Sequence, residues 1–130
     1  MIEVYTINQA LISGSAIPFN NVAIQKGKTA VLSAPSNISL NAPGIYMVSV
    51  DGTFMGATAG TGEVQLSRNG VAVEAAASSA TLAADTTIPY AFTTFVQVPR
   101  CCASIPVDLK CVYTGDEATG DINVCVSKIC

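Results

Sequence analysis

Apolar and polar residues alternate with a period of two along much of this chain, most clearly at residues 45–50. The turn dipeptide Pro43-Gly44 precedes this segment and Asp51-Gly52 follows it. Successive side chains of a strand point to opposite faces, so one face is purely apolar: Tyr46, Val48 and Val50. The other face is mixed: Ile45, Met47, Ser49 and Asp51. We expect the apolar face to cover a core and the mixed face to meet another polypeptide.

Similar short segments, separated by turn residues, predict further strands on both sides of this one. Before it they are residues 4–7, 10–12, 22–25, 29–32 and 38–40. After it they are residues 88–98, 107–113 and 122–129, with a polar loop predicted at residues 114–121. Between these groups, Asn69-Gly70 predicts a type I′ turn joining a strand with Val64 and Leu66 to one with Val71 and Val73.

Only residues 75–84 have a composition that would suit a helix. They lack an apolar stripe of helical period and contain serines and threonine, which favours a small-residue strand or a loop. The chain of 130 residues is therefore predicted to be one all-β domain, residues 1–130. Its expected architecture is a ten-odd-stranded antiparallel jelly-roll sandwich, with residues 1–17 as an N-terminal strand or arm.

Composition adds an expectation about assembly. Charged residues make up 12% of the chain, about half the usual share. Fifteen charges, six basic and nine acidic, must cover a monomer surface of roughly 6,500 Å². Monomers so poor in charge tend to associate, so a buried subunit interface is predicted. A monomer solvated by Ser, Thr and Asn is the alternative.

Several classes of partner and activity are not expected. The net charge is −3 and the basic residues are scattered along the sequence, which argues against nucleic acid. No apolar run reaches the ~18 residues of a membrane span. The first residues, 1–5, show no signal peptide, so we expect synthesis in the cytoplasm. The chain has no histidine and no phosphate-binding loop, so we predict a protein that is not an enzyme and needs no cofactor.

The order of these landmarks is specific. The run Pro43-Gly44-Ile45-Tyr46-Met47-Val48-Ser49-Val50 resembles the turn and central strand of the tumour necrosis factor and complement-head jelly rolls. Residues 64–70 resemble the outer-sheet hairpin of that family, and the last strand lies similarly close to the C-terminus. The closest likeness is to the small bacterial or phage version.

This resemblance implies a homotrimer in which the inner sheets pack around a three-fold axis. The side chains expected to face the axis are Ile45, Met47, Ser49, Thr93, Phe95, Asn123, Cys125 and Ser127. Those expected in the core are Tyr46, Val48, Val50, Phe92, Val96, Val124 and Val126.

Five cysteines lie in the last thirty residues: Cys101, Cys102, Cys111, Cys125 and Cys130. They lack the paired spacing of a zinc site, and no metal is expected. Reduced thiols, a disulfide within or between chains, and a metal on the three-fold axis remain open. Asp116, Glu117 and Asp121 do not have the spacing of a calcium loop, so a solvated loop is expected there.

The resulting hypothesis is a trimeric structural protein at the surface of a virion, specifically a phage accessory protein that decorates the head or forms an appendage. Partners that this role leaves open are other virion proteins or a cell-surface receptor. The alternative hypothesis is a trimeric adhesin, that is, a carbohydrate- or receptor-binding head. The chain has no Trp, which disfavours a sugar platform.

Overall fold

The computed structural model describes residues 1–100 and 106–130, and all of its regular elements are strands. The vicinal cysteines Cys101 and Cys102 therefore lie outside the described residues. The strands are β1 (Ile2–Leu11), β2 (Ser15–Ala16), β3 (Asn21–Gln25), β4 (Ala30–Ala34), β5 (Asn37–Leu40), β6 (Gly44–Gly56), β7 (Gly60–Arg68), β8 (Val71–Leu82), β9 (Thr87–Val98), β10 (Val107–Gly115) and β11 (Ala118–Lys128). None of the described residues forms a helix long and apolar enough to cross a membrane.

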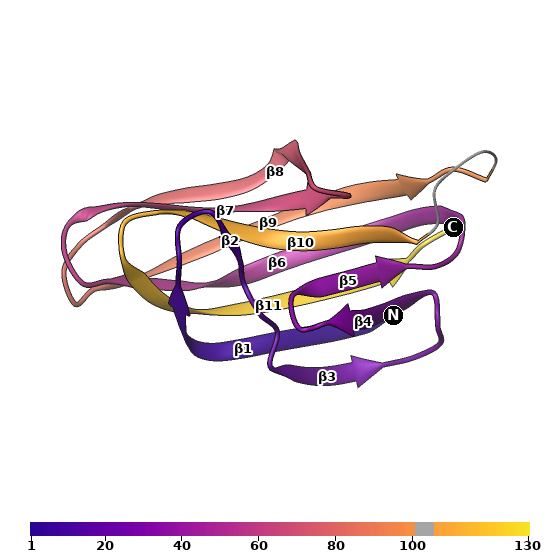
Figure 1. Cartoon of the computed structure of the whole chain (residues 1–130), viewed down its shortest axis with the longest axis horizontal. Helices are drawn as coiled ribbons and strands as arrows, with labels where there is room; N and C mark the ends of the chain where they lie inside the picture. The colour runs from indigo at the N-terminus through magenta and orange to yellow at the C-terminus, as the bar shows by residue number, and fades with distance from the viewer. Residues whose placement is uncertain (101–105) are drawn as a thin grey trace.

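Two antiparallel sheets face each other across the core (Figure 1). Sheet A has the order β3-β1-β11-β6-β9, and sheet B has the order β4-β5-β10-β7-β8, with β2 paired to β10. Strands distant in sequence lie side by side, since β1 pairs with β11 and β5 pairs with β10. This non-sequential order is the expected jelly-roll arrangement, and the predicted all-β sandwich is confirmed.

The core lies between the sheets and is formed by alternate residues of their strands. Tyr46, Val48 and Val50 of β6 are all 0% exposed, as predicted from their alternation. Val96, Val124 and Val126 are also buried, whereas Phe92 of the predicted core set is only half-buried against it. Each such side chain stabilises the fold by roughly 1.5–3 kcal/mol through removal of apolar surface from water.

The β7–β8 hairpin forms as the Asn-Gly dipeptide predicts. Arg68 pairs with Val71, and the two turn residues both have positive φ, 49° at Asn69 and 82° at Gly70. Both angles are those of a type I′ turn, whose twist matches that of the flanking strands. The small-residue tract after the turn is strand, not helix, because it pairs with β7 as far as Leu82 opposite Gly60.

Strand β8 carries a wide irregularity that the sequence pattern does not indicate. Ala72 pairs with Ser67 and Ala77 pairs with Gln65, so residues 73–76 stand opposite a single residue of β7. The Gln65 Nε2 donates a hydrogen bond of 3.3 Å to the carbonyl of Val73 and holds the irregular segment in place. A distortion of this kind in an edge strand hinders pairing with strands of other molecules.

Two sequence expectations are wrong. The predicted loop at residues 114–121 is mostly strand, since β10 continues to Gly115 and β11 begins at Ala118. Its polar residues pair with residues of neighbouring strands, Thr114 with Glu63 of β7 and Thr119 with Met55 of β6. Backbone pairing between strands therefore outweighs the loop-like composition of this segment. The predicted strands 4–7 and 10–12 are one strand, β1, interrupted by a register shift where Asn8 has a φ of 53°.

Both chain ends lie at one end of the elongated sandwich (Figure 1). The opposite end is formed by the turns between β6 and β7, between β8 and β9, and between β10 and β11. Strand β1, which contains most of the predicted N-terminal strand or arm, lies inside sheet A between β3 and β11.

A close crossing of side chain and backbone ties three strands of sheet A together. The Tyr90 ring of β9 stacks on Phe54 of β6, with ring centroids 4.3 Å apart. Its hydroxyl passes over Gly52 and donates a hydrogen bond of 3.1 Å to the carbonyl of Asp121 in β11. A Cβ on Gly52 would overlap that carbonyl oxygen and lie 2.7 Å from the Tyr90 hydroxyl, so this crossing requires glycine.

The substitution Gly52→Ala should therefore be strongly destabilising. We expect a loss of about 3 kcal/mol or more in the free energy of unfolding, because backbone must move to admit the methyl group. Gly70→Ala is the control: its φ is positive but its Cβ would contact nothing within 4 Å, so about 1–2 kcal/mol is expected. Denaturant unfolding measures the free energy of unfolding of both variants. Equal losses would contradict the close contact of Gly52 with the Asp121 carbonyl and the Tyr90 hydroxyl.

Candidate functional site

The face of sheet A that points away from the core is the candidate functional site, here called the open face. The structure places on it all eight side chains predicted to face a three-fold axis. They are Ile45, Met47 and Ser49 of β6, Thr93 and Phe95 of β9, and Asn123, Cys125 and Ser127 of β11.

Strand register brings these side chains into adjoining rows. Met47 stands opposite both Phe95 and Ser127, and Ser49 stands opposite both Thr93 and Cys125. Directly opposed residues in antiparallel strands have Cβ atoms about 4.5–5.5 Å apart, so each row is continuous. The eight residues therefore form one patch that crosses three neighbouring strands.

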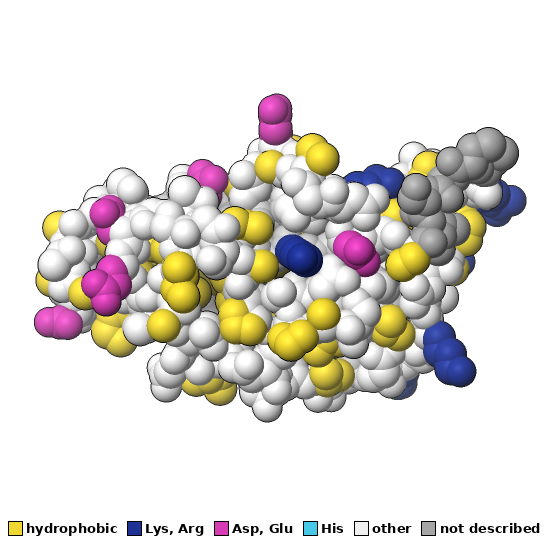
Figure 2. Space-filling model, in the orientation of Figure 1, with side chains coloured by type: hydrophobic (Ala, Val, Ile, Leu, Met, Phe, Trp, Pro, Cys, Tyr) yellow, Lys and Arg dark blue, Asp and Glu magenta, His cyan; other side chains and the backbone are white. Residues whose placement is uncertain are grey.

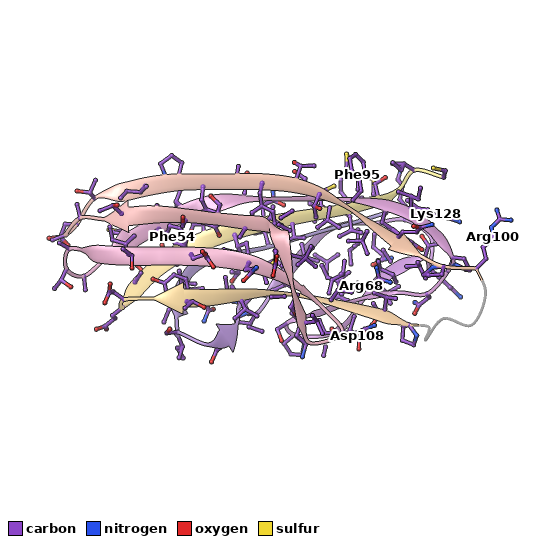
Figure 3. The ribbon with its side chains drawn as sticks, turned by 90° about the horizontal axis from the view of Figure 1, so that it is seen from above. Phe54, Arg68, Phe95, Arg100, Asp108 and Lys128 are labelled. Carbon is purple, nitrogen blue, oxygen red and sulfur yellow. The ribbon has the colours of Figure 1, made fainter. Side chains whose placement is uncertain are left out.

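Phe95 is the most exposed large apolar side chain of this patch, at 61%. It points away from the sandwich, whereas Phe54 lies between the sheets (Figure 3). Further apolar side chains are exposed toward the other end of the open face, with Ile7 at 60% and Met55 at 40%. Large apolar side chains exposed together on one face are typical of an interaction surface.

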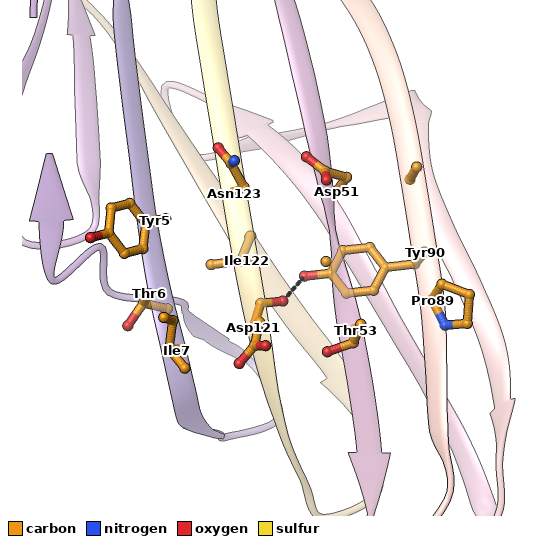
Figure 4. Close-up of a pocket in the computed structure, with 12 residues that line it drawn as sticks. Tyr5, Thr6, Ile7, Asp51, Thr53, Pro89, Tyr90, Asp121, Ile122 and Asn123 are labelled. Carbon is orange, nitrogen blue, oxygen red and sulfur yellow. Dashed lines mark hydrogen bonds between the residues drawn. The ribbon is translucent and has the colours of Figure 1, made fainter. Parts of the chain in front are cut away.

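Between these two apolar regions the open face is hollowed. The hollow has a volume of about 510 Å³, and its polar lining includes Tyr5, Asp51, Thr53, Asp121 and Asn123 (Figure 4). The alternation of β6 places Asp51 on this face, but it does not indicate a hollow. The hollow depends on β1 and on small residues such as Ala91, which the pattern of a single strand cannot reveal.

The chemistry of the hollow and its margin is rich in hydrogen-bond acceptors. The Asn123 side chain donates a hydrogen bond of 3.2 Å from Nδ2 to Glu3 Oε2. Its Oδ1 is buried and has no hydrogen-bond partner in the described part of the chain. Asp121 accepts the backbone N–H of Asn8 at 2.8 Å, which fixes its carboxylate at the irregular point of β1. Buried acceptors without a donor are costly, so the Asn123 Oδ1 is an unfavourable feature of the single chain.

The three described cysteines differ in burial. Cys111 is buried among core residues, and burial raises its pKa to about 12. Cys125 is half-buried on the open face, where burial and the nearby Glu3 carboxylate raise its pKa. Cys130 is exposed. All three are free thiols in the described chain, and no three His, Cys, Asp or Glu side chains within residues 1–100 and 106–130 are grouped to hold a metal ion.

The acidic residues that could have suggested calcium have structural partners instead. The Asp116 carboxylate accepts the backbone N–H of Thr61 at 2.8 Å, which joins the β10–β11 turn to β7. The Tyr113 hydroxyl donates a hydrogen bond of 2.5 Å to the Asp116 carbonyl from within the core. These contacts define a tight turn between two strands.

The sandwich architecture is that of a known class. No protein-family model matches the chain, and no curated protein matches it in sequence. Solved structures do match it. The globular domain of a zebrafish complement 1qA protein aligns over 95% of this chain and 94% of its own, with a TM-score of 0.70 and 8% identity. The Eiger TNF of S. frugiperda aligns over 99% and 92%, with a TM-score of 0.69 and 10% identity. Murine APRIL at pH 5.0 aligns over 98% of both chains, with a TM-score of 0.63 and 12% identity.

The chain is thus an antiparallel jelly roll. More particularly, it has the fold shared by the tumour necrosis factors and the complement C1q heads. The resemblance carried by the Pro43-Gly44 turn and by the Asn69-Gly70 hairpin is confirmed at the level of the fold.

Thiol reactivity should follow these environments. At about pH 8 the thiolate is the reactive form, so exposed Cys130 should be alkylated readily while Cys111 stays unmodified in the folded protein. Peptide mass mapping assigns each site, and alkylation in denaturant is the control in which Cys111 should react. Modification of Cys111 in the folded protein at the rate of Cys130 would contradict its burial.

The raised pKa of Cys111 also has a consequence for stability. Its folded-state pKa of about 12 lies above the ordinary value of 9.0, so the neutral thiol is favoured by folding. The contribution of the neutral thiol to the stability of the folded state is complete below pH 9.0 and is lost as the pH rises toward 12.

Proposed function

We propose that this protein is a homotrimer in which the open faces of three sheets A pack around a three-fold axis. The single observation that carries this proposal is the patch around Met47 and Phe95. It is continuous across three strands, and Phe95 is 61% exposed. The fold is consistent with such packing, because the axis-facing set implied by the resemblance coincides with this patch.

The sparse charge of the chain supports the same arrangement. The single chain exposes 6556 Å², and 15 charged residues over that area leave about 440 Å² to each. Obligate interfaces bury about 2,000 Å² or more and are more hydrophobic than other surfaces. Burial of the open face in a trimer would remove the exposed apolar side chains of the patch from water.

The role we propose for this trimer is structural, at the surface of a phage virion, as a head decoration or appendage protein. Two properties support it: a fold built for trimer assembly, and a likeness of the motifs to the small bacterial and phage jelly rolls. Nothing among the described side chains resembles a nucleophile with its base, because the chain has no histidine. We therefore propose an assembly role in preference to catalysis.

Oligomeric state tests the trimer directly. Light scattering in buffer of moderate salt should give a mass of about 40 kDa, which is three chains of 13.3 kDa. Phe95→Asp and Met47→Asp should each lower the mass to that of one folded chain, because a carboxylate would be buried against apolar side chains. A wild-type chain that is folded and monomeric would contradict the trimer.

Two matched substitutions control this experiment. Val71→Asp alters an apolar side chain that is 70% exposed but lies on sheet B, so the trimer should persist. Val48→Asp places a charge in the core at a fully buried position, so the chain should fail to fold. Dissociation by Val71→Asp, or a folded Val48→Asp monomer, would contradict the assignment of faces.

The virion role has a separate test. Purified phage particles from a culture that produces the protein should contain it, and mass spectrometry should give a copy number divisible by three. Immunogold electron microscopy should place it on the outside of the particle. Absence from the particles would contradict this role and leave the trimer proposal unaffected.

A further inference from the structure

The charged side chains of this protein are separated along its long axis, although they are scattered along the sequence. Figure 2 shows several Asp and Glu side chains gathered at one end of the molecule, others near its middle, and most Lys and Arg side chains toward the opposite end. The six basic and nine acidic residues all belong to the described part of the chain, and the separation involves four of the basic and five of the acidic residues.

The end opposite the chain termini, here called the acidic end, has five carboxylates. Asp85 lies in the turn between β8 and β9, and Asp116 and Glu117 form the turn between β10 and β11. Glu63 and Asp121 each lie three residues into the strand that leaves this end. No Lys or Arg occurs in any of these turns or beside them.

The end that holds the termini, here called the basic end, has four exposed cations and one carboxylate, that of Glu3 near the start of β1. Lys26 and Lys28 lie in the turn between β3 and β4, Arg100 follows β9, and Lys128 ends β11. Figure 3 shows Arg100 and Lys128 at this end. Arg68 and Lys110 lie toward the middle of sheet B, and Asp108 is close to them in the same strands.

The proposed trimer strengthens this separation of charge, and the inference rests on that proposed function. The strands of the open face run along the long axis of the chain. If the three-fold axis is parallel to these strands, rotation about it leaves the position of every residue along that direction unchanged. Rotation then places three acidic ends together and three basic ends together. The assembly would have 15 carboxylates at one end, and 12 Lys and Arg side chains with three Glu3 carboxylates at the other, three times the numbers in one chain.

We propose that the trimers associate head to tail, with the basic end of one trimer against the acidic end of the next. The occupant of each end is a second copy of this protein, because the complementary surface for both ends is present on the same molecule. An anionic partner of another kind would account for the basic end alone. A head-to-tail contact is heterologous and does not close, so it produces linear stacks.

The salt dependence of this contact follows from its charge. Charges attract over about 30 Å at 0.01 M salt but only over about 8–10 Å near physiological ionic strength. The trimer interface is largely apolar and should change little with salt. Stacking and trimer formation are therefore distinguishable in one titration.

The first experiment measures mass at two ionic strengths. Sedimentation velocity at about 10 mM salt should show species at least about twice the mass of the trimer, and at about 300 mM only the trimer should remain. Trimer alone at both salt concentrations would overturn the stacking proposal and leave the proposed function intact. Monomer at high salt would contradict the proposed function.

The second experiment removes most of the charge of one end at a time. Variant one carries Lys26→Glu and Lys28→Glu, and variant two carries Glu63→Lys and Glu117→Lys. Counted over the four cations and the five carboxylates assigned to the two ends, the first variant lowers the charge of the basic end from +4 to 0 per chain, and the second lowers that of the acidic end from −5 to −1, so neither should stack alone at low salt. An equimolar mixture should restore species at least about twice the trimer mass, because unlike ends can meet again.

Matched controls change charge away from the ends. Lys110→Glu lies on β10, and Glu74→Lys lies in the irregular segment of β8, so both should stack as the wild type does. Stacking by either end variant alone, or no stacking in the mixture, would overturn the proposal. The second result would mean that the ends bind something other than this chain.

Discussion

The structure depends on the pairing of β6 with two neighbours along its length of 13 residues. It pairs with β11 from Tyr46 to Gly56 and with β9 from Gly44 to Met55. Because side chains alternate, a slip of one residue in either pairing would send Tyr46, Val48 and Val50 to the outside. The pairing thus determines the core and the open face together.

This constraint explains why the sequence predicts so much of the candidate site. The alternation of side chains is visible within the sequence of each strand of the patch. The aligned register of β6, β9 and β11 then brings their mixed faces to the same side of the sheet. Ile45, Met47 and Phe95 could be assigned to one face from the sequence because their neighbours Tyr46 and Val96 are unambiguously apolar core residues. The Asn69-Gly70 turn was similarly predictable, since its conformation is a property of the dipeptide itself.

Other features could not be predicted because they depend on distant pairings. Polar composition at residues 114–121 suggested a loop, but Thr114 and Thr119 lie on strands whose partners come from β7 and β6. The hollow in the open face combines residues of β1, β6, β9 and β11. The separation of charge arises from folding as well: Lys26 and Lys128 are about a hundred positions apart in the sequence, yet both lie at the basic end.

The position of both chain ends has a consequence for engineering. A protein fused to either terminus of the described chain would emerge at the basic end, beside Lys26 and Lys128. The tight turns at residues 57–59, 83–86 and 116–117 lie at the opposite end, away from the fused protein, and could accept short peptide inserts. The jelly roll is in this sense a two-ended display scaffold, with cargo at one end and grafted loops at the other.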